Sequence, residues 1–125
     1  MLDLTFYKGK RVLVTGHTGF KGTWLCHILL LAGADVTGYS LEPPTDPSMF
    51  EITGLGGRMN SVIGDIRDYE HLKKVFDEVQ PEIVLHLAAQ PIVLESYNDP
   101  KYTYETNVMG TVNILECIRT IESVK

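Results

Sequence analysis

Residues 12–23 place a glycine-rich turn directly between an apolar run and the start of a helix-forming stretch. The turn carries Gly16, Gly19 and Gly22, in the spacing Gly-x-x-Gly-x-x-Gly. In such a context the first glycine allows a tight exit from a strand, the second lets a pyrophosphate approach the backbone, and the third permits close packing of helix against strand. The helix start then directs unpaired backbone N–H groups at the pyrophosphate. The segment therefore predicts a dinucleotide-binding turn.

Composition and charge narrow the class of protein. With 125 residues, 44% of them hydrophobic and 22% charged, the chain has the composition of one globular domain. Sixteen acidic residues outnumber eleven basic ones, and no basic cluster occurs, so we expect no nucleic-acid partner. The apolar stretch at residues 28–32 is too short to cross a bilayer, and residues 1–10 are unlike a secretory signal. We therefore expect a cytoplasmic protein without a membrane partner.

The two cysteines, Cys26 and Cys117, both lie in apolar stretches with helical spacing. Buried, reduced thiols are the interpretation that this placement favours over a disulfide or a reactive site. We also expect no metal site in this chain.

Hydrophobic periodicity predicts an alternation of strands and helices. Strands are expected at residues 11–15, 35–40, 60–63 and 82–87, and helices at 19–32, 49–55, 69–79 and 102–121. Residues 42–48 hold three prolines, and a loop containing Pro100 is expected before the last helix. Right-handed crossovers then predict an α/β fold, a Rossmann-type doubly wound parallel sheet that is incomplete and has the strand order 3-2-1-4.

Other segments of the chain, together with the glycine turn, resemble a known family. GDIRD at residues 64–68, HLAAQ at 86–90 and TNVMGTVN at 106–113 resemble the extended, sugar-nucleotide-modifying branch of the short-chain dehydrogenase/reductase superfamily. Within that branch, GHTGFKGTW at 16–24, TGYSLEPPT at 37–45 and LAAQP at 87–91 are similar to the CDP-glucose 4,6-dehydratases. Lys21 and the Tyr-Ser-Leu-x-Pro-Pro loop at residues 39–44 depart from the commoner patterns of epimerases and other dehydratases in the branch.

This resemblance implies an activity, a cofactor and partners. Hydride would move from C4 of CDP-glucose to bound NAD, water would leave across C5 and C6, and the hydride would return to C6. The net reaction is that of a lyase, and it gives a 4-keto-6-deoxy sugar. The implied partner is a small-molecule nucleotide sugar, and we expect a homo-oligomer for the intact protein.

The resemblance also assigns cofactor contacts after the third strand. Asp65 would accept a hydrogen bond from the adenine amino group, and Ile66 would pack against the adenine ring. The alternative for Asp65 is a simple turn residue, since Gly-Asp is a common turn pair.

A second set of contacts is implied after the fourth strand. Leu87, Ala88 and Ala89 would line the adenosine and the central part of the cofactor, and Gln90 would point toward the nicotinamide or the sugar. Packing residues are an equal alternative for Ala88 and Ala89.

The end of the second strand bears on the choice between NAD and NADP. Ser40 occupies the position where an acidic ribose ligand is usual, and a serine can hydrogen-bond a ribose hydroxyl. No arginine adjoins it to bind a 2′-phosphate, so we predict NAD. Glu42 lies at the usual distance from the third glycine, but two prolines follow it and leave its direction open.

Three further side chains belong to the glycine turn. We include His17, Phe20 and Lys21 among the cofactor contacts, with solvation as the alternative for His17 and Lys21. His86, inside an apolar strand, is interpreted instead as a hydrogen-bonded core histidine. For Asn107 we expect an organising hydrogen bond to backbone near the fourth strand.

The catalytic groups of the superfamily are a Ser or Thr after a fifth strand and a Tyr-x-x-x-Lys pair on a helix, in which lysine lowers the tyrosine pKa. Two stretches match the bare pattern, Tyr69 with Lys73 and Tyr97 with Lys101, but we interpret both as coincidences because neither lies in a suitable context.

We therefore expect residues 1–125 to be the N-terminal part of an NAD-binding domain, with catalytic residues downstream and the substrate domain absent. Two alternatives stay open. One is an NADP-dependent reductase or nucleotide-sugar epimerase on the same scaffold, and the other is a non-catalytic dinucleotide-binding module.

Overall fold

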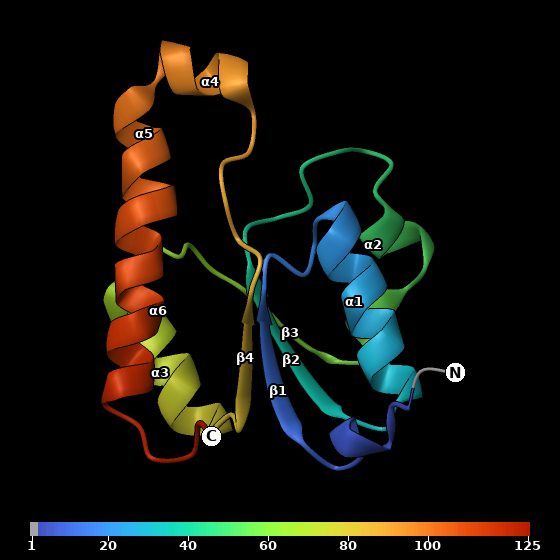
Figure 1. Cartoon of the computed structure of the whole chain (residues 1–125). Helices are drawn as coiled ribbons and strands as arrows, with labels where there is room; N and C mark the ends of the chain where they lie inside the picture. The colour runs from blue at the N-terminus through green and yellow to red at the C-terminus, as the bar shows by residue number, and fades with distance from the viewer. Residues whose placement is uncertain (1–2) are drawn as a thin grey trace.

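The structure, a computed structural model, describes residues 3–125 and centres on one parallel sheet (Figure 1). Its strands are β1 (Arg11–Thr15), β2 (Asp35–Ser40), β3 (Asn60–Ile63) and β4 (Ile83–His86). Their order is β3-β2-β1-β4, and each neighbouring pair is parallel. This confirms the predicted fold class and strand order.

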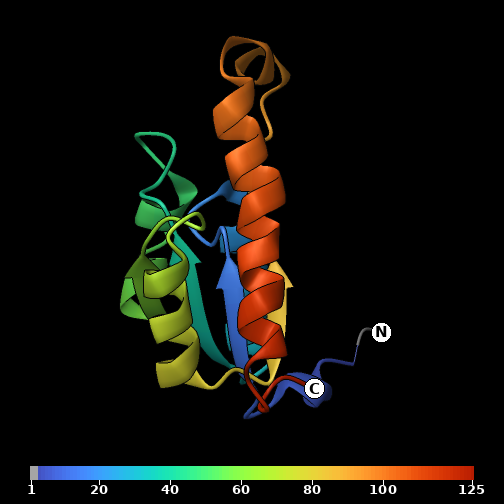
Figure 2. The ribbon, with the colours of Figure 1, turned by 90° about the vertical axis from the view of Figure 1, so that its left-hand side faces the viewer.

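Helices cover both faces of the sheet. The first face carries α1 (Phe20–Leu31) and the short α2 (Met49–Ile52), and the second carries α3 (Tyr69–Val79) and α6 (Gly110–Arg119) (Figure 1). The remaining elements are the 3₁₀ turns η1 (Thr5–Tyr7) and η2 (Leu55–Gly57), α4 (Val93–Asn98), α5 (Pro100–Tyr104) and the π-helical η3 (Glu105–Met109). Elements α5, η3 and α6 form one long column that extends past the carboxyl ends of the strands (Figure 2).

Strand β1 is buried on both faces, so it contributes residues to both hydrophobic cores of the protein. Val12 and Val14 pack with Cys26 beneath α1, whereas Leu13 packs with Phe76 and other residues beneath α3 and α6. Successive residues of a strand point to opposite faces, so a short apolar run can serve two layers. Both cysteines are free and buried, as predicted.

The connection after β4 differs from the prediction. The expected loop contains α4, and Pro100 begins α5 instead of lying in a loop. The side chain of Asp99 accepts a hydrogen bond from the backbone N–H of Tyr102, and a proline at the first helical position has no N–H to satisfy. The prediction was wrong because it treated Pro100 as a helix breaker when its position suits a helix start.

Among residues 3–125, no helix is long and apolar enough to cross a membrane. The same residues contain no group of three or more His, Cys, Asp or Glu side chains placed to hold a metal ion.

Candidate dinucleotide site

The glycine turn lies against the exit of β4 at the carboxyl edge of the sheet. Gly16 has a φ of +76°, and a Cβ there would lie 2.9 Å from the backbone nitrogen of Ala88. A Cβ on Gly22 would lie only 2.0 Å from the carbonyl oxygen of Gly16. The first and third glycines are therefore required by the packing of the protein itself.

Gly19 differs from its two neighbours in the motif. It is the N-cap residue of α1 with φ −77° and ψ 169°, and its nearest contact for a Cβ is the Gly16 oxygen at 3.5 Å. Nothing in the protein excludes a side chain there. No side chain caps α1 either, so its first N–H groups suit an anion. The protein therefore leaves room for a Cβ at Gly19, and a pyrophosphate contact there stays a prediction.

Thr15 joins the turn to β4 through its hydroxyl oxygen. This atom accepts hydrogen bonds from the N–H groups of Leu87 (3.0 Å) and Ala88 (3.1 Å) and lies 2.6 Å from Nδ1 of His86. Because the hydroxyl has one proton, it donates that proton to Nδ1, and Nε2 of His86 then donates to Thr111. Burial lowers the pKa of His86. These bonds support its interpretation as a hydrogen-bonded structural residue, although the side chain is only partly buried and lies outside the two cores.

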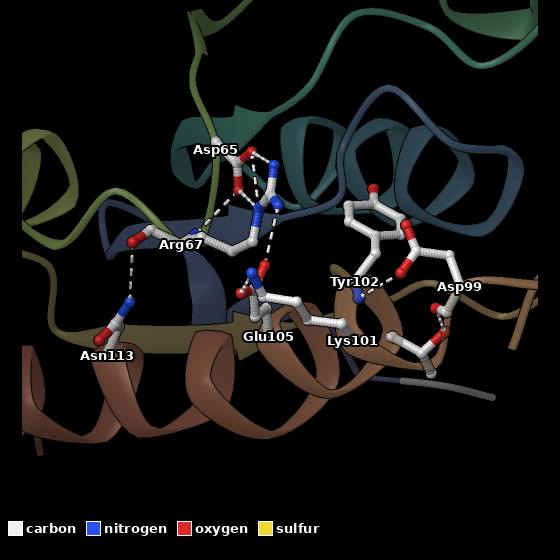
Figure 3. Close-up of polar contacts among 8 residues, drawn as sticks. Asp65, Arg67, Asp99, Lys101, Tyr102, Glu105 and Asn113 are labelled. Atoms are coloured by element: carbon white, nitrogen blue, oxygen red, sulfur yellow. Dashed lines mark hydrogen bonds and ion pairs between the residues drawn. The ribbon is translucent and has the colours of Figure 1, made fainter.

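Asp65 lies two residues after the end of β3, in a charged cluster with Arg67 (Figure 3). Arg67 donates to its carboxylate from Nε, Nη2 (2.7 Å) and the backbone N–H, and these bonds lower the pKa of Asp65. The guanidinium also lies 3.4 Å from Glu105 and stacks over the ring of Tyr102. The cluster thus holds the Asp65 loop against the long helix, and the adenine contact of Asp65 stays a prediction.

Ile66 has a core role beside the adenine role predicted for it. Its side chain is buried among the residues packed under α3 and α6, and a Cβ on Gly110 would lie 2.6 Å from it. Asn113 donates a hydrogen bond to the Ile66 carbonyl (3.0 Å) and also contacts the carbonyl of Arg67 (3.4 Å), which is the contact drawn in Figure 3. This packing holds the loop after β3, and contact with an adenine ring stays a prediction.

The side chain of His17 is placed differently from a solvated loop residue. It is fully buried, Nε2 lies 2.7 Å from the hydroxyl of Ser61, and the ring fills the space where a Cβ on Gly38 would lie. Burial lowers the pKa of His17 to about 4. Burial corrects the solvated alternative. The imidazole is neutral at pH 7 and so cannot bind a phosphate as a cation, and a ribose contact of His17 stays a prediction. Phe20 and Lys21, by contrast, are exposed at the start of α1.

Gln90 is tied into the long helix. Asn107 accepts a hydrogen bond from the Gln90 N–H (2.7 Å) and donates one to its carbonyl (3.0 Å), which confirms the organising role expected for Asn107. The Gln90 amide bonds Thr103 and the backbone of Ile92. Both ends of the amide are thus paired within the protein, and its contact with the nicotinamide or the sugar stays a prediction.

We predict that Asn107→Ala lowers the free energy of unfolding by about 2 kcal/mol, because both backbone groups of Gln90 lose their partner. Urea denaturation followed by circular dichroism measures the change. Asn98→Ala is the matched control, since Asn98 is exposed, and it should cost less than about 0.5 kcal/mol. Equal costs for the two variants would contradict this role.

A surface hollow of about 380 Å³ lies apart from the turn, along the long helix. It is lined by Ser96, Pro100, Thr103, Tyr104, Asn107 and Val108. It shares no residue with the glycine turn. The turn is the better candidate site, because it combines the open helix N-terminus with the polar groups that follow β2 and β3.

Residues 13–125 match the family described as GDP-mannose 4,6 dehydratase. The chain belongs to this family.

Relatives of this chain include 4,6-dehydratases of the kind that its motifs resemble. CDP-glucose 4,6-dehydratase of Salmonella typhimurium is 55% identical over 100% of this chain and 35% of its own length. GDP-mannose 4,6 dehydratase of Drosophila melanogaster is 34% identical over 90% of the chain and 30% of its own length. The chain thus spans about a third of these relatives.

The fold is similar to solved structures of nucleotide-sugar enzymes. UDP-glucose 4-epimerase from Brucella ovis, in complex with NAD, has 30% sequence identity and a TM-score of 0.78, over 92% of this chain and 34% of that one. The UDP-glucose 4-epimerase complex with NAD from Thermus thermophilus has 35% identity and a TM-score of 0.75, over 87% and 33%.

The two stretches with the Tyr-x-x-x-Lys pattern of the wider superfamily do not form tyrosine–lysine pairs. Lys73 pairs with Asp77, and Lys101 pairs with Glu105. Tyr97 is 81% exposed on α4. Their interpretation as coincidences is supported by these other partners.

Sequence reasoning missed two residues of the site. Arg67 could have been noticed as the cation inside GDIRD, but its contact with Glu105, 38 residues away, has no sequence signal. Thr18 is an unassigned position of the glycine motif, and its hydroxyl contacts Ser40. Both contacts depend on how the strand ends meet in space.

Proposed function

We propose that this chain is the NAD-binding part of a nucleotide-sugar 4,6-dehydratase that converts CDP-glucose to CDP-4-keto-6-deoxyglucose. The observation that carries the cofactor proposal is the open space at Gly19, beside an α1 N-terminus that no side chain caps. The 55% identity to a CDP-glucose 4,6-dehydratase supports the choice of sugar nucleotide.

The residues of the chain would bind and orient the dinucleotide. The first N–H groups of α1 would bind the pyrophosphate, Ser40 the adenosine ribose, and Asp65 the adenine amino group. Bound NAD supplies reversible hydride transfer, so the net reaction is a lyase reaction without net oxidation. The tyrosine and lysine that would move protons are expected outside residues 1–125.

We also propose that the intact protein is cytoplasmic and homo-oligomeric. The long helix supports self-association, because it exposes several large apolar side chains on successive turns. These are Tyr104, Val108, Val112 and Leu115. Within residues 3–125 the outer edge of β4 also has no paired strand.

A nucleotide-sugar epimerase is the second candidate function, and the likeness to UDP-glucose 4-epimerases favours it. The two reactions differ in their products. A longer chain carrying this sequence, incubated with CDP-glucose, should release a product that has lost one water, as measured by mass spectrometry. A product of unchanged mass and altered stereochemistry would support the epimerase instead.

We predict that this chain binds NAD weakly, prefers it to NADP and shows no turnover. Ser40 offers a ribose hydroxyl a partner but gives a 2′-phosphate no cation. Calorimetric titration with each dinucleotide measures both affinities. Tighter binding of NADP would contradict the cofactor proposal.

A further inference from the structure

Two hydroxyl groups from distant parts of the chain meet at the carboxyl edge of the sheet. Thr18 lies in the glycine turn and is only 4% exposed, and Ser40 is the last residue of β2. Their oxygen atoms are 2.9 Å apart. The Thr18 hydroxyl also lies 2.8 Å from the carbonyl oxygen of Leu41. The turn is thus bonded to the end of β2 through one buried side chain.

The number of hydroxyl protons determines which residue of this pair is the hydrogen-bond donor. The Leu41 carbonyl can only accept, so Thr18 donates its single hydroxyl proton there. The contact between the two hydroxyls then needs the proton of Ser40, which is donated to Thr18. Ser40 therefore has no proton left for a ligand. Its remaining lone pairs can only accept a hydrogen bond.

We infer that Thr18 is a positioning residue that makes Ser40 select a ribose with a free 2′-hydroxyl. That hydroxyl can donate to the lone pairs of Ser40. A 2′-phosphate has only acceptor oxygens at neutral pH, so it would meet lone pairs and negative partial charge. An acceptor-only serine can thus favour NAD over NADP without the carboxylate that many dinucleotide sites use. This inference rests on the proposed NAD binding.

The test compares the affinities of the 125-residue chain for NAD and NADP by calorimetric titration. Thr18→Val removes the acceptor for the Ser40 proton at nearly constant volume. Ser40 can then donate to a 2′-phosphate, so NADP affinity should rise about tenfold, the effect of one hydrogen bond to a charged group, while NAD affinity changes less than about twofold. Thr18→Ser keeps the hydroxyl and should keep the wild-type preference.

Ser40→Ala gives an independent measurement if Thr18→Val does not fold. It removes the acceptor for the ribose hydroxyl, so NAD affinity should fall about fivefold with NADP affinity unchanged. In a double-mutant cycle, Thr18→Val should have no further effect on the NAD/NADP ratio once Ser40 is alanine. A structural role of Thr18 alone would lower both affinities together and leave their ratio unchanged.

The outcomes separate this inference from the proposed function. A wild-type chain that binds neither dinucleotide would contradict the proposed function and the inference with it. If Thr18→Val or Ser40→Ala keeps the wild-type preference for NAD unchanged, the inference is overturned and the proposed function still stands. A ratio that falls in Thr18→Val and is restored in Thr18→Ser would support it.

Discussion

Gly22→Ala is expected to lower the free energy of unfolding by about 3 kcal/mol or more. The added Cβ would lie 2.0 Å from the Gly16 oxygen and 2.8 Å from the His17 Cα, which are backbone atoms that cannot rotate away. Helix α1 must therefore shift away from the strand, and overpacking of this kind costs about 1–3 kcal/mol even where side chains can adjust. Urea denaturation followed by circular dichroism measures the loss.

Gly57→Ala is the matched control for this effect. A Cβ on Gly57 has no neighbour within 4 Å, and the residue is exposed. Its substitution should change stability by less than about 1 kcal/mol and could raise it, because alanine restricts the unfolded chain. A Gly22→Ala protein as stable as the Gly57→Ala protein would show that α1 does not pack on the turn as described.

Gly19→Ala is expected to leave the fold intact and to remove most of the dinucleotide affinity. The backbone of Gly19 is extended, and its Cβ would make only an ordinary contact at 3.5 Å. That same methyl group would occupy the space where the pyrophosphate must approach the backbone. The steric cost predicts a loss of NAD affinity of roughly tenfold to hundredfold. Calorimetry measures the affinity, and thermal unfolding measures the fold.

The contrast between two glycines of one motif makes this prediction specific. Gly22→Ala should act on stability, whereas Gly19→Ala should act on binding. An unchanged NAD affinity in Gly19→Ala would mean that the ligand does not approach this turn. A large loss of stability in Gly19→Ala would mean that the protein itself, and no ligand, requires glycine there.

The strands could be located from the sequence because apolar runs and turn-forming residues act locally, and the order of the strands followed from their connections. Val12, Leu13 and Val14 are consecutive and apolar, as a strand buried on both faces requires, and the glycine turn fixes where that strand ends. Right-handed crossovers, together with the dinucleotide-binding fold that the glycine turn indicates, then favour the order 3-2-1-4. The described sheet has that arrangement.

The side-chain partners within the site could not be predicted, since they join segments that are far apart in the chain. Thr18 meets Ser40 across 22 positions, and Arg67 meets Glu105 across 38. His17 belongs to a motif that suggested solvent or ligand, yet Gly38 within β2 leaves space for its ring against the sheet. No periodicity records such a space. Pro100 was misread for a local reason, because a proline both breaks a helix and suits its first position.

Titration of the isotope-labelled wild-type chain with NAD, followed by backbone amide chemical shifts in NMR spectra, tests the central claim most directly. Binding at the glycine turn predicts saturable shifts at Gly19, Phe20 and Lys21, with further shifts at Ser40 and Asp65. Saturable shifts confined to the hollow between Ser96 and Val108, or none at the turn at saturating NAD, would contradict it.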